Sequence, residues 1–209
     1  AQIAIECNQN DQHGGQSVPN FDYYMAEGVA KSFARHYQEN LQKALELLGG
    51  AEGAIGIISS QPLSMQNLPA YQGSERKALL SRGLSPEQAA RVQAFAAAHA
   101  QDETGKETYQ AMEAFLHNMN LINSRAGAQV PFSSINYGAD VSPEGRLVTA
   151  CLLKATEAGI GQGKTAIFPV QIFKVKEGVN YNPGDPNYDL FHLSMAVSAK
   201  RLFPNFSFL

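Results

Sequence analysis

The sequence has few cysteines, little net charge and no long apolar run, and each of these absences excludes a class of protein. Its two cysteines, Cys7 and Cys151, are too few for a disulfide framework or a four-cysteine metal site. A net charge of -3 at pH 7 offers no electrostatic attraction to nucleic acid or to a membrane surface. No apolar run is long enough to span a bilayer. We therefore expect a cytoplasmic protein that binds neither nucleic acid nor membranes.

The hydrophobic content and the order of the expected elements indicate an α/β fold. With 209 residues, of which 44% are hydrophobic, the chain can bury the core of a single domain, which we expect to span residues 1–209. Helical and strand-like patterns alternate with short connections in its second half, which predicts a sheet buried on both faces. Both ends of the sequence look like the interior of elements, so we expect a fragment.

Periodicity predicts the main helices. Apolar residues at three- and four-residue steps indicate a helix from Asn20 to the Gly49-Gly50 pair. Residues 51–103, rich in Gly, Pro, Ser and Gln as far as Gly73, are interpreted as a peripheral excursion. Further helices are expected from Ser85, as N-cap, to about Ala100, from Lys106 to Ser124, after Ser142 and from Asp185 to Arg201, with strands over Thr165–Lys176 and at the end of the chain.

The stretch 129–140, QVPFSSINYGAD, is predicted to be a buried strand around which the fold is organised. One of its faces begins with Val130 and Phe132 and ends with Ser134 and Asn136, so it becomes polar toward its carboxyl end. Ligands of α/β folds bind where the strands end, which makes this end a candidate binding surface. The alternative is an ordinary core strand whose serines bond to the neighbouring backbone.

Two further segments have both a structural and a functional interpretation. The loop 11–17, DQHGGQS, has paired glycines that permit a close backbone approach, and it is either a polar ligand-binding loop or a solvated connector. Lys31 and Arg35 lie one turn apart on the first long helix, where such pairs usually form a solvated face.

Cys151 lies on an apolar helix face, which favours a buried structural thiol.

The run 158–165, AGIGQGKT, is similar to a phosphate-binding P-loop but has the wrong context. That motif requires a strand before the loop and a helix after it, so that backbone N–H groups point at the phosphates. Here a helix precedes the run and a strand follows it. We interpret its glycines as a helix C-cap and a turn.

Three long blocks of the sequence closely resemble the anaerobic, class III ribonucleoside-triphosphate reductases, a family of glycyl radical enzymes. The blocks are residues 8–26, 108–148 and 167–209, and they include NQNDQHGGQS, RAGAQVPFSSINYGAD and IFPVQIFKVKEGVNYNPGD. The resemblance implies part of a ten-stranded α/β barrel, incomplete in this chain, with 51–103 as a variable excursion. It also implies the reduction of ribonucleoside triphosphates to deoxyribonucleoside triphosphates for DNA synthesis.

The resemblance implies a radical chemistry whose key groups lie elsewhere. In the family, a glycyl radical generates a thiyl radical on a cysteine, which takes the ribose 3′ hydrogen, and formate or a thiol system is the reductant. The thiyl cysteine, the glycyl radical loop and a structural zinc site are expected after residue 209, and a second pocket cysteine before residue 1. Neither Cys7 nor Cys151 matches a radical position, so we expect no catalytic residue, no metal and no cofactor in this fragment, and no activity of it alone.

The remaining implications concern binding. By resemblance, the substrate pocket would be lined by His13, Gly14, Gly15, Gln16, Ser17, Ser133, Ser134 and Asn136. Arg35, with Lys31 as its neighbour, matches an allosteric effector site for nucleoside triphosphates at a homodimer interface. A radical-SAM iron-sulfur enzyme would be the activating partner. The alternative hypothesis is a non-catalytic nucleotide-binding or dimerisation module derived from the same barrel.

Overall fold

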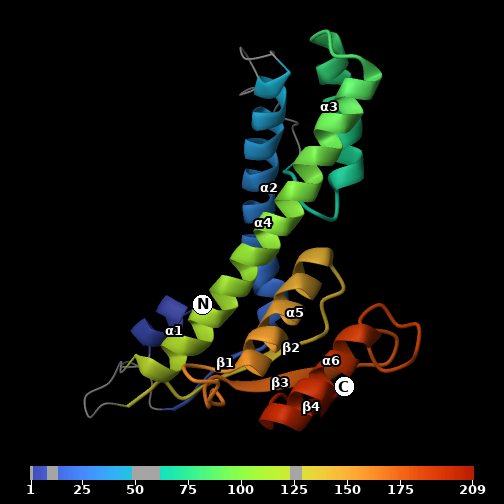
Figure 1. Cartoon of the computed structure of the whole chain (residues 1–209). Coiled ribbons are helices and arrows are strands. Elements are labelled where there is room, and N and C mark those ends of the chain that lie inside the picture. Colours follow the sequence, from blue (N-terminus) through green and yellow to red (C-terminus); the bar gives the residue numbers. More distant parts are fainter. Residues whose placement is uncertain (1, 9–13, 49–61, 123–128) are drawn as a thin grey trace. The chain divides into compact units, whose positions relative to one another are not determined.

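The computed structural model describes residues 2–8, 14–48, 62–122 and 129–209. The chain forms two compact units (Figure 1): unit 1 comprises Ala1–Ala26 and Thr108–Leu209, and unit 2 comprises Glu27–Glu107. Both boundaries fall inside long helices, α2 (Phe21–Leu47) and α4 (Pro86–Leu121), so each of these helices contributes to both units.

Unit 1 contains a four-stranded parallel sheet whose strands follow one another in chain order (Figure 1). The α/β architecture is therefore confirmed, and so are the strands expected within 129–140, within Thr165–Lys176 and at the end of the chain. The first two of these strands are shorter than the sequence predicts. The sheet was not expected to include the segment after the paired glycines, which forms a short edge strand. The strands are β1 (Gln16–Val18), β2 (Ser133–Tyr137), β3 (Val170–Val175) and β4 (Asn205–Phe208).

Short helices complete unit 1. The helix α1 (Gln2–Asn8) precedes β1, and α5 (Pro143–Ala158) connects β2 to β3. Ser142 caps α5 as expected, because its side chain accepts a hydrogen bond from Gly145 N at 3.1 Å. The last helix, α6 (Tyr188–Arg201), begins with Asn187 as N-cap, two residues later than the Asp185-Pro186 start that the sequence predicts.

Helices cover one face of the sheet. On this face Tyr137 donates a hydrogen bond to Gln171 (2.8 Å), which in turn donates to Thr156 of α5 (2.9 Å), and Phe173 stacks on Phe191 of α6. The side chains that alternate with these are exposed or only partly buried. The expectation of a sheet buried on both faces is therefore wrong for the described residues, which leave the second face open.

Unit 2 is a packed group of helices formed by parts of α2 and α4 together with α3 (Leu68–Ser81). Val29, Phe33, Tyr37, Leu41 and Leu45 of α2 are buried in the spacing that the sequence predicts, whereas Tyr24, before the start of unit 2, is exposed. The core of the unit consists of Phe33, Tyr37, Leu41, Ala44, Leu45, Leu63, Tyr71, Leu79, Ala89, Val92, Ala96 and Ala100.

Two features of unit 2 differ from the expectation. The sequence interpretation missed α3, and it divided α4 into two helices with a break near Gly105. One glycine in a helix interior costs only about 1 kcal/mol relative to alanine, so the long helix continues through it. Ser85 begins α4 as expected, because its hydroxyl accepts from Gln88 N while the Gln88 side chain accepts from Ser85 N.

The glycine-rich run after α5 is a helix end and a turn, as predicted. Gly159 is the C-cap of α5 with a φ of 79°. The Arg201 guanidinium donates to the backbone carbonyls of Glu157, Ala158 and Gly163, at 2.6 to 3.1 Å. The run follows α5 and leads into β3, so its N–H groups do not stand at the start of a helix, as a phosphate-binding loop requires. None of the helices in the described ranges has the length and apolar character needed to cross a membrane.

Candidate functional site

The uncovered face of the sheet, called here the open face, is mostly polar. Residues that pair in parallel strands point to the same side, so the register defines its members. Ser17 pairs with Ser134, Asn136 pairs with Ile172, and Lys174 pairs with Ser207. The open face thus carries Ser17, Ser134, Asn136, Val170, Ile172, Lys174, Asn205 and Ser207.

The open face changes from apolar to polar along the strands. At the amino end lie Phe132, which is 64% exposed, and Phe168, whose ring meets it edge-on at 5.3 Å between centroids. At the carboxyl end lie Asn136 and Lys174. This is the end at which parallel α/β sheets bind their ligands, so the carboxyl end of the open face is the candidate site.

Asn136 carries the clearest sign of a binding function. Its side-chain oxygen Oδ1 is buried, yet it has no hydrogen-bond partner in the described part of the chain. A buried polar atom without a partner costs about 1–3 kcal/mol, and most such atoms are satisfied in folded proteins. A ligand hydroxyl or amine that donates to this oxygen would remove that cost.

The residues directly before β1 pack on the amino end of β2. His13 lies outside the described residues, and Gly14 is exposed. A Cβ atom on Gly15 would lie 2.6 Å from a ring carbon of Phe132, so a larger residue there would displace this ring. Gln16 N donates to the Phe132 carbonyl at 3.0 Å, and the Gln16 side chain donates to the Ile5 carbonyl at 2.8 Å.

The predicted pocket residues divide between the two faces of the sheet. Ser17, Ser134 and Asn136 share the open face. Gln16 and Ser133 pair with each other on the opposite face, and Ser133 is buried there with its hydroxyl donating to the Pro131 carbonyl at 3.3 Å. A period of two explains this division, because adjacent residues of a strand cannot line the same surface.

A buried set of polar side chains, called here the Gly138 clamp, holds the turn that follows β2. Asp22 of α2 accepts from Gly138 N (2.8 Å) and Asp140 N (3.0 Å). Asn180 and Asn187 both donate to the Gly138 carbonyl, at 2.9 and 3.2 Å. Asp22, Asn180 and Asn187 are at most 2% exposed. The sequence interpretation missed this clamp, which fixes the carboxyl end of β2 two residues after Asn136.

The residues around the Gly138 clamp require glycine at position 138 and keep the neighbouring Tyr137 neutral. Gly138 has a φ of 107°, and a Cβ atom there would lie 2.8 Å from the Phe173 ring, so glycine is required on both grounds. Burial, and secondly the charge of Asp22, holds the pKa of Tyr137 well above its usual value. The Tyr137 hydroxyl therefore stays neutral and remains a donor to Gln171.

Comparison with known proteins places the chain in a family. The family model described as anaerobic ribonucleoside-triphosphate reductase matches residues 1–209. The chain belongs to the anaerobic ribonucleoside-triphosphate reductase family. This confirms the family that the three sequence blocks indicated.

Three curated proteins, each named anaerobic ribonucleoside-triphosphate reductase, are similar to one half of this chain. The proteins of Salmonella typhimurium and of phage T4 are 36% identical to it over 108 residues, and that of Escherichia coli is 35% identical over 108 residues. These alignments cover 51% of this chain, but only 15% of the two bacterial proteins and 18% of the phage protein. The matched region therefore spans a small part of each reductase.

The two cysteines of this reductase-family chain lie on helices and not on the strands of the sheet. Cys151 is buried on α5, and burial raises the pKa of its thiol, an effect that Lys154 opposes. This confirms the buried thiol that the helix pattern predicts. Cys7 is exposed on α1. In the described ranges, no three His, Cys, Asp or Glu side chains are grouped so as to hold a metal ion.

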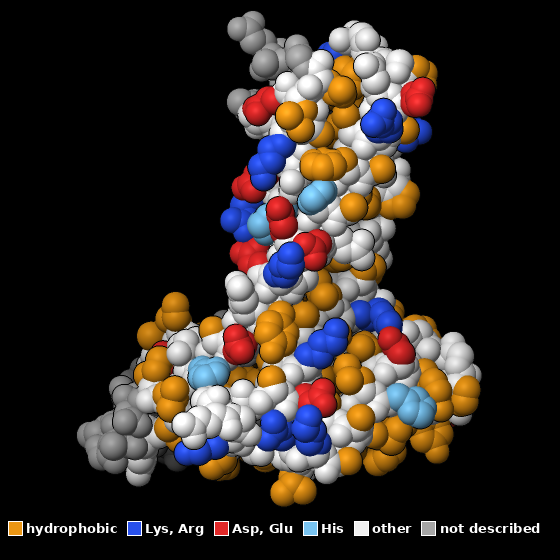
Figure 2. All heavy atoms as spheres, in the orientation of Figure 1, with side chains coloured by type: hydrophobic (Ala, Val, Ile, Leu, Met, Phe, Trp, Pro, Cys, Tyr) orange, Lys and Arg blue, Asp and Glu red, His pale blue; other side chains and the backbone are white. Residues whose placement is uncertain are grey.

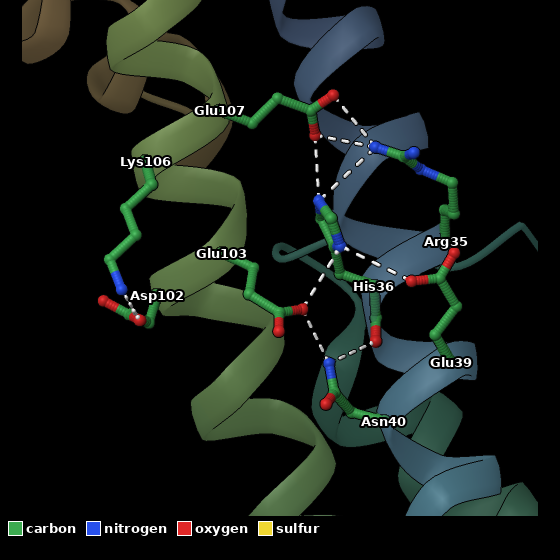
Figure 3. A network of polar contacts seen from close by, with 8 residues as sticks. All are labelled: Arg35, His36, Glu39, Asn40, Asp102, Glu103, Lys106 and Glu107. Carbon is green, nitrogen blue, oxygen red and sulfur yellow. Dashed lines mark hydrogen bonds and ion pairs between the residues drawn. The ribbon is translucent and has the colours of Figure 1, made fainter.

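Arg35 and Lys31, which the resemblance assigned to an effector site, lie in unit 2, where acidic, basic and histidine side chains gather on one face (Figure 2). The Arg35 guanidinium donates to both carboxylate oxygens of Glu107, at 2.8 and 2.9 Å (Figure 3). Lys31 pairs with Glu27 at 2.7 Å. His36 lies between α2 and α4, with Nε2 2.9 Å from Glu107.

The pKa of Glu107 is lowered within this cluster. Burial acts to raise it, but hydrogen bonds from His36 and Ser32 and the charge and hydrogen bond of Arg35 outweigh burial. The contribution of Glu107 to stability is therefore present above pH 4.5, the unfolded value, and is lost as the pH falls through the lowered folded value. Since the Glu107 side chain is 45% exposed, this contribution is small.

Proposed function

We propose that the protein carrying this chain reduces ribonucleoside triphosphates to 2′-deoxyribonucleoside triphosphates, and that the open face forms part of its substrate pocket. The unpartnered, buried oxygen of Asn136 carries the proposal for the site, and membership of the reductase family supports the reaction. The carboxamide would accept a hydrogen bond from a ribose hydroxyl. Ser134 and Ser17 would supply further hydroxyl donors and acceptors from the neighbouring positions.

In this proposal the role of the chain is to bind and orient the sugar. Radical chemistry would be supplied by a thiyl cysteine and a glycyl radical on segments outside residues 1–209, with a structural zinc site there as well. Cys151 of α5 and Cys7 of α1 are not assigned the radical role, because the resemblance matches neither of them with a radical position. A rigid β2 end, held by the Gly138 clamp, would keep the ribose in register with the reacting group.

The test is substitution of Asn136 by alanine in the full-length protein. Loss of one hydrogen bond to the ribose predicts a fall in kcat/KM of about tenfold or more, since such a bond contributes ~1.5 kcal/mol. Ser133→Ala is the matched control, because Ser133 belongs to the same strand but points to the covered face. Steady-state reduction of one ribonucleoside triphosphate gives kcat/KM for each of the two variants. Equal losses in the two variants would contradict the assignment of the open face.

We further propose that Arg35 and Lys31 contribute to an effector site for nucleoside triphosphates, formed in a cytoplasmic homodimer that a radical-SAM enzyme activates. The Arg35 guanidinium is a strong phosphate ligand, and Glu107 already fixes its position.

Arg35→Ala is expected to weaken effector binding about tenfold, which is the usual value of one charge-assisted hydrogen bond. Equilibrium binding of the effector triphosphates measures the loss. Lys106→Ala is the control, because Lys106 also pairs with an acidic side chain, Asp102, but apart from the Arg35–Glu107 pair (Figure 3). Identical affinities in the wild type and in the Arg35 variant would remove Arg35 from the site.

A further inference from the structure

Lys174 occupies an unusual position among the cationic side chains. It lies near the carboxyl end of β3 on the open face, paired with Ser207 of β4. Its ammonium donates to the Pro19 carbonyl at 2.5 Å and to the Asn20 side-chain oxygen at 2.7 Å, just after β1. The last register pair between β2 and β3 joins Tyr137 to Phe173, so the Lys174 side chain passes beyond the end of β2 to reach β1.

The charge of Lys174 is not compensated by an acid within the described ranges. No carboxylate there lies within 4.0 Å of its ammonium, and both of its contacts are neutral oxygens. Lys31, Lys106 and Lys200, by contrast, each pair with an acidic side chain. Lys174 is also partly buried, whereas every other lysine of the chain is exposed. Lys174 can therefore take an anionic ligand without first breaking an ion pair.

The surroundings of Lys174 suit an anionic ligand. An ammonium has three donors, and the two oxygens that it contacts fix its direction while leaving the third donor for a ligand. Lysine binds phosphate as a compact point charge. Asn136 and Ser207 lie on the same face, and anionic ligands of parallel sheets bind at this end of the strands.

We propose that Lys174 binds the phosphate groups of the nucleotide on the open face. This assignment rests on the proposed function for the class of ligand, and it adds a residue to which the sequence analysis gave no role. Asn136 would then contact the sugar and Lys174 the charged end, so the two side chains would define the direction in which the nucleotide lies across the carboxyl ends of β2 and β3.

The test compares a charged ligand with an uncharged one in the full-length protein. Titration calorimetry with a ribonucleoside triphosphate, with the same nucleoside lacking phosphate, and with inorganic tripolyphosphate would be made on the wild type, K174M and K174R. K174M is expected to lose about tenfold or more in affinity for the triphosphate and for tripolyphosphate, and nothing for the nucleoside. K174R is expected to recover part of the loss.

The controls separate charge from structure. Lys154→Met removes the positive charge of an exposed side chain on α5 in the same unit, and it should leave all three affinities unchanged. Equal losses of nucleoside and triphosphate in K174M, or no binding of tripolyphosphate by the wild type, would overturn the proposal. Steady-state reduction is measured separately: a wild type that binds triphosphate through Lys174 but reduces none would contradict the proposed function and leave the Lys174 assignment in place.

Discussion

Replacement of Asp22 by alanine is expected to lower the free energy of unfolding of unit 1 by about 3–5 kcal/mol. The Asp22 carboxylate is 2% exposed and accepts hydrogen bonds from the backbone N–H groups of Gly138 and Asp140. Alanine would leave both donors buried without partners, and each such group costs about 1–3 kcal/mol. The carboxylate also lies in the first turn of α2, where a negative charge is favourable.

Urea unfolding of the protein would measure this loss, and hydrogen exchange at the Gly138 and Asp140 amides would locate it. Both amides donate to the same carboxylate oxygen, Oδ2, so the single carbonyl oxygen of Asp22→Asn can keep both bonds and this variant should lose much less stability than Asp22→Ala. Glu177→Ala removes an exposed acid after β3 and should change stability by less than about 0.5 kcal/mol. If Asp22→Ala were as mild as Glu177→Ala, the clamp would not hold the end of β2.

Replacement of Tyr37 by phenylalanine is expected to lower the stability of unit 2 by about 2–3 kcal/mol at neutral pH. The Tyr37 hydroxyl donates to Glu75 at 2.7 Å, and Gln93 donates to the same oxygen at 2.9 Å. Glu75 is 2% exposed in the helical core, so each lost donor leaves a buried carboxylate short of a partner. Thermal or urea unfolding of wild type and variant gives the difference.

The loss in the Tyr37 variant should depend on pH. Burial raises the pKa of Glu75, although the bonds from Gln93 and Tyr37 act to lower it. A raised folded pKa means that the contribution of Glu75 to stability is fully present below pH 4.5, the unfolded value, and is lost as the pH rises through the folded value. The contribution of Glu75 should therefore make the wild type less stable as the pH rises. The loss of stability caused by Tyr37→Phe should become smaller in acid, where Glu75 is neutral.

Glu75→Gln provides the decisive comparison for this network. It keeps an acceptor for Tyr37 and Gln93 but cannot ionise, so it should be more stable than the wild type at pH 7–8 and should remove the pH dependence that Glu75 causes. Glu113→Gln, on the part of α4 that belongs to unit 1, should change neither the stability at pH 7–8 nor its pH dependence. A Tyr37→Phe penalty of the same size from pH 4 to pH 8 would argue against a titrating Glu75.

Local signals in the sequence were sufficient where the structure depends on neighbours along the chain. Ser142 and Ser85 cap their helices as expected, because an N-cap is formed by residues only a few positions apart. The alternation in β2 placed Ser134 and Asn136 together on one face, which the register confirms. The same alternation places Ser133 on the opposite face, since adjacent residues of a strand point to opposite sides, and the register shows it there. The assignment of Ser133 to the pocket came from the resemblance alone.

The features that the sequence did not reveal depend on contacts between distant segments. Asp22 and Gly138 are 116 residues apart, and Lys174 reaches Pro19 across 155 residues, so no local pattern connects them. The helix α3 was missed because Pro69 and Gly73 read as breakers, although a proline is tolerated in the first turn of a helix. Packing in the core of unit 2 outweighs the low propensity of these residues.

The position of unit 2 in the chain explains how this sheet can tolerate a large addition. All of Glu27–Glu107 is inserted between β1 and β2, which are neighbours in the sheet. Strand pairing depends on where a connection leaves and returns, and the entropy of closing a flexible connection rises by only ~0.6 kcal/mol for each doubling of its length. Evolution could therefore lengthen, shorten or remodel this insertion with little effect on the pairing of the strands that it separates.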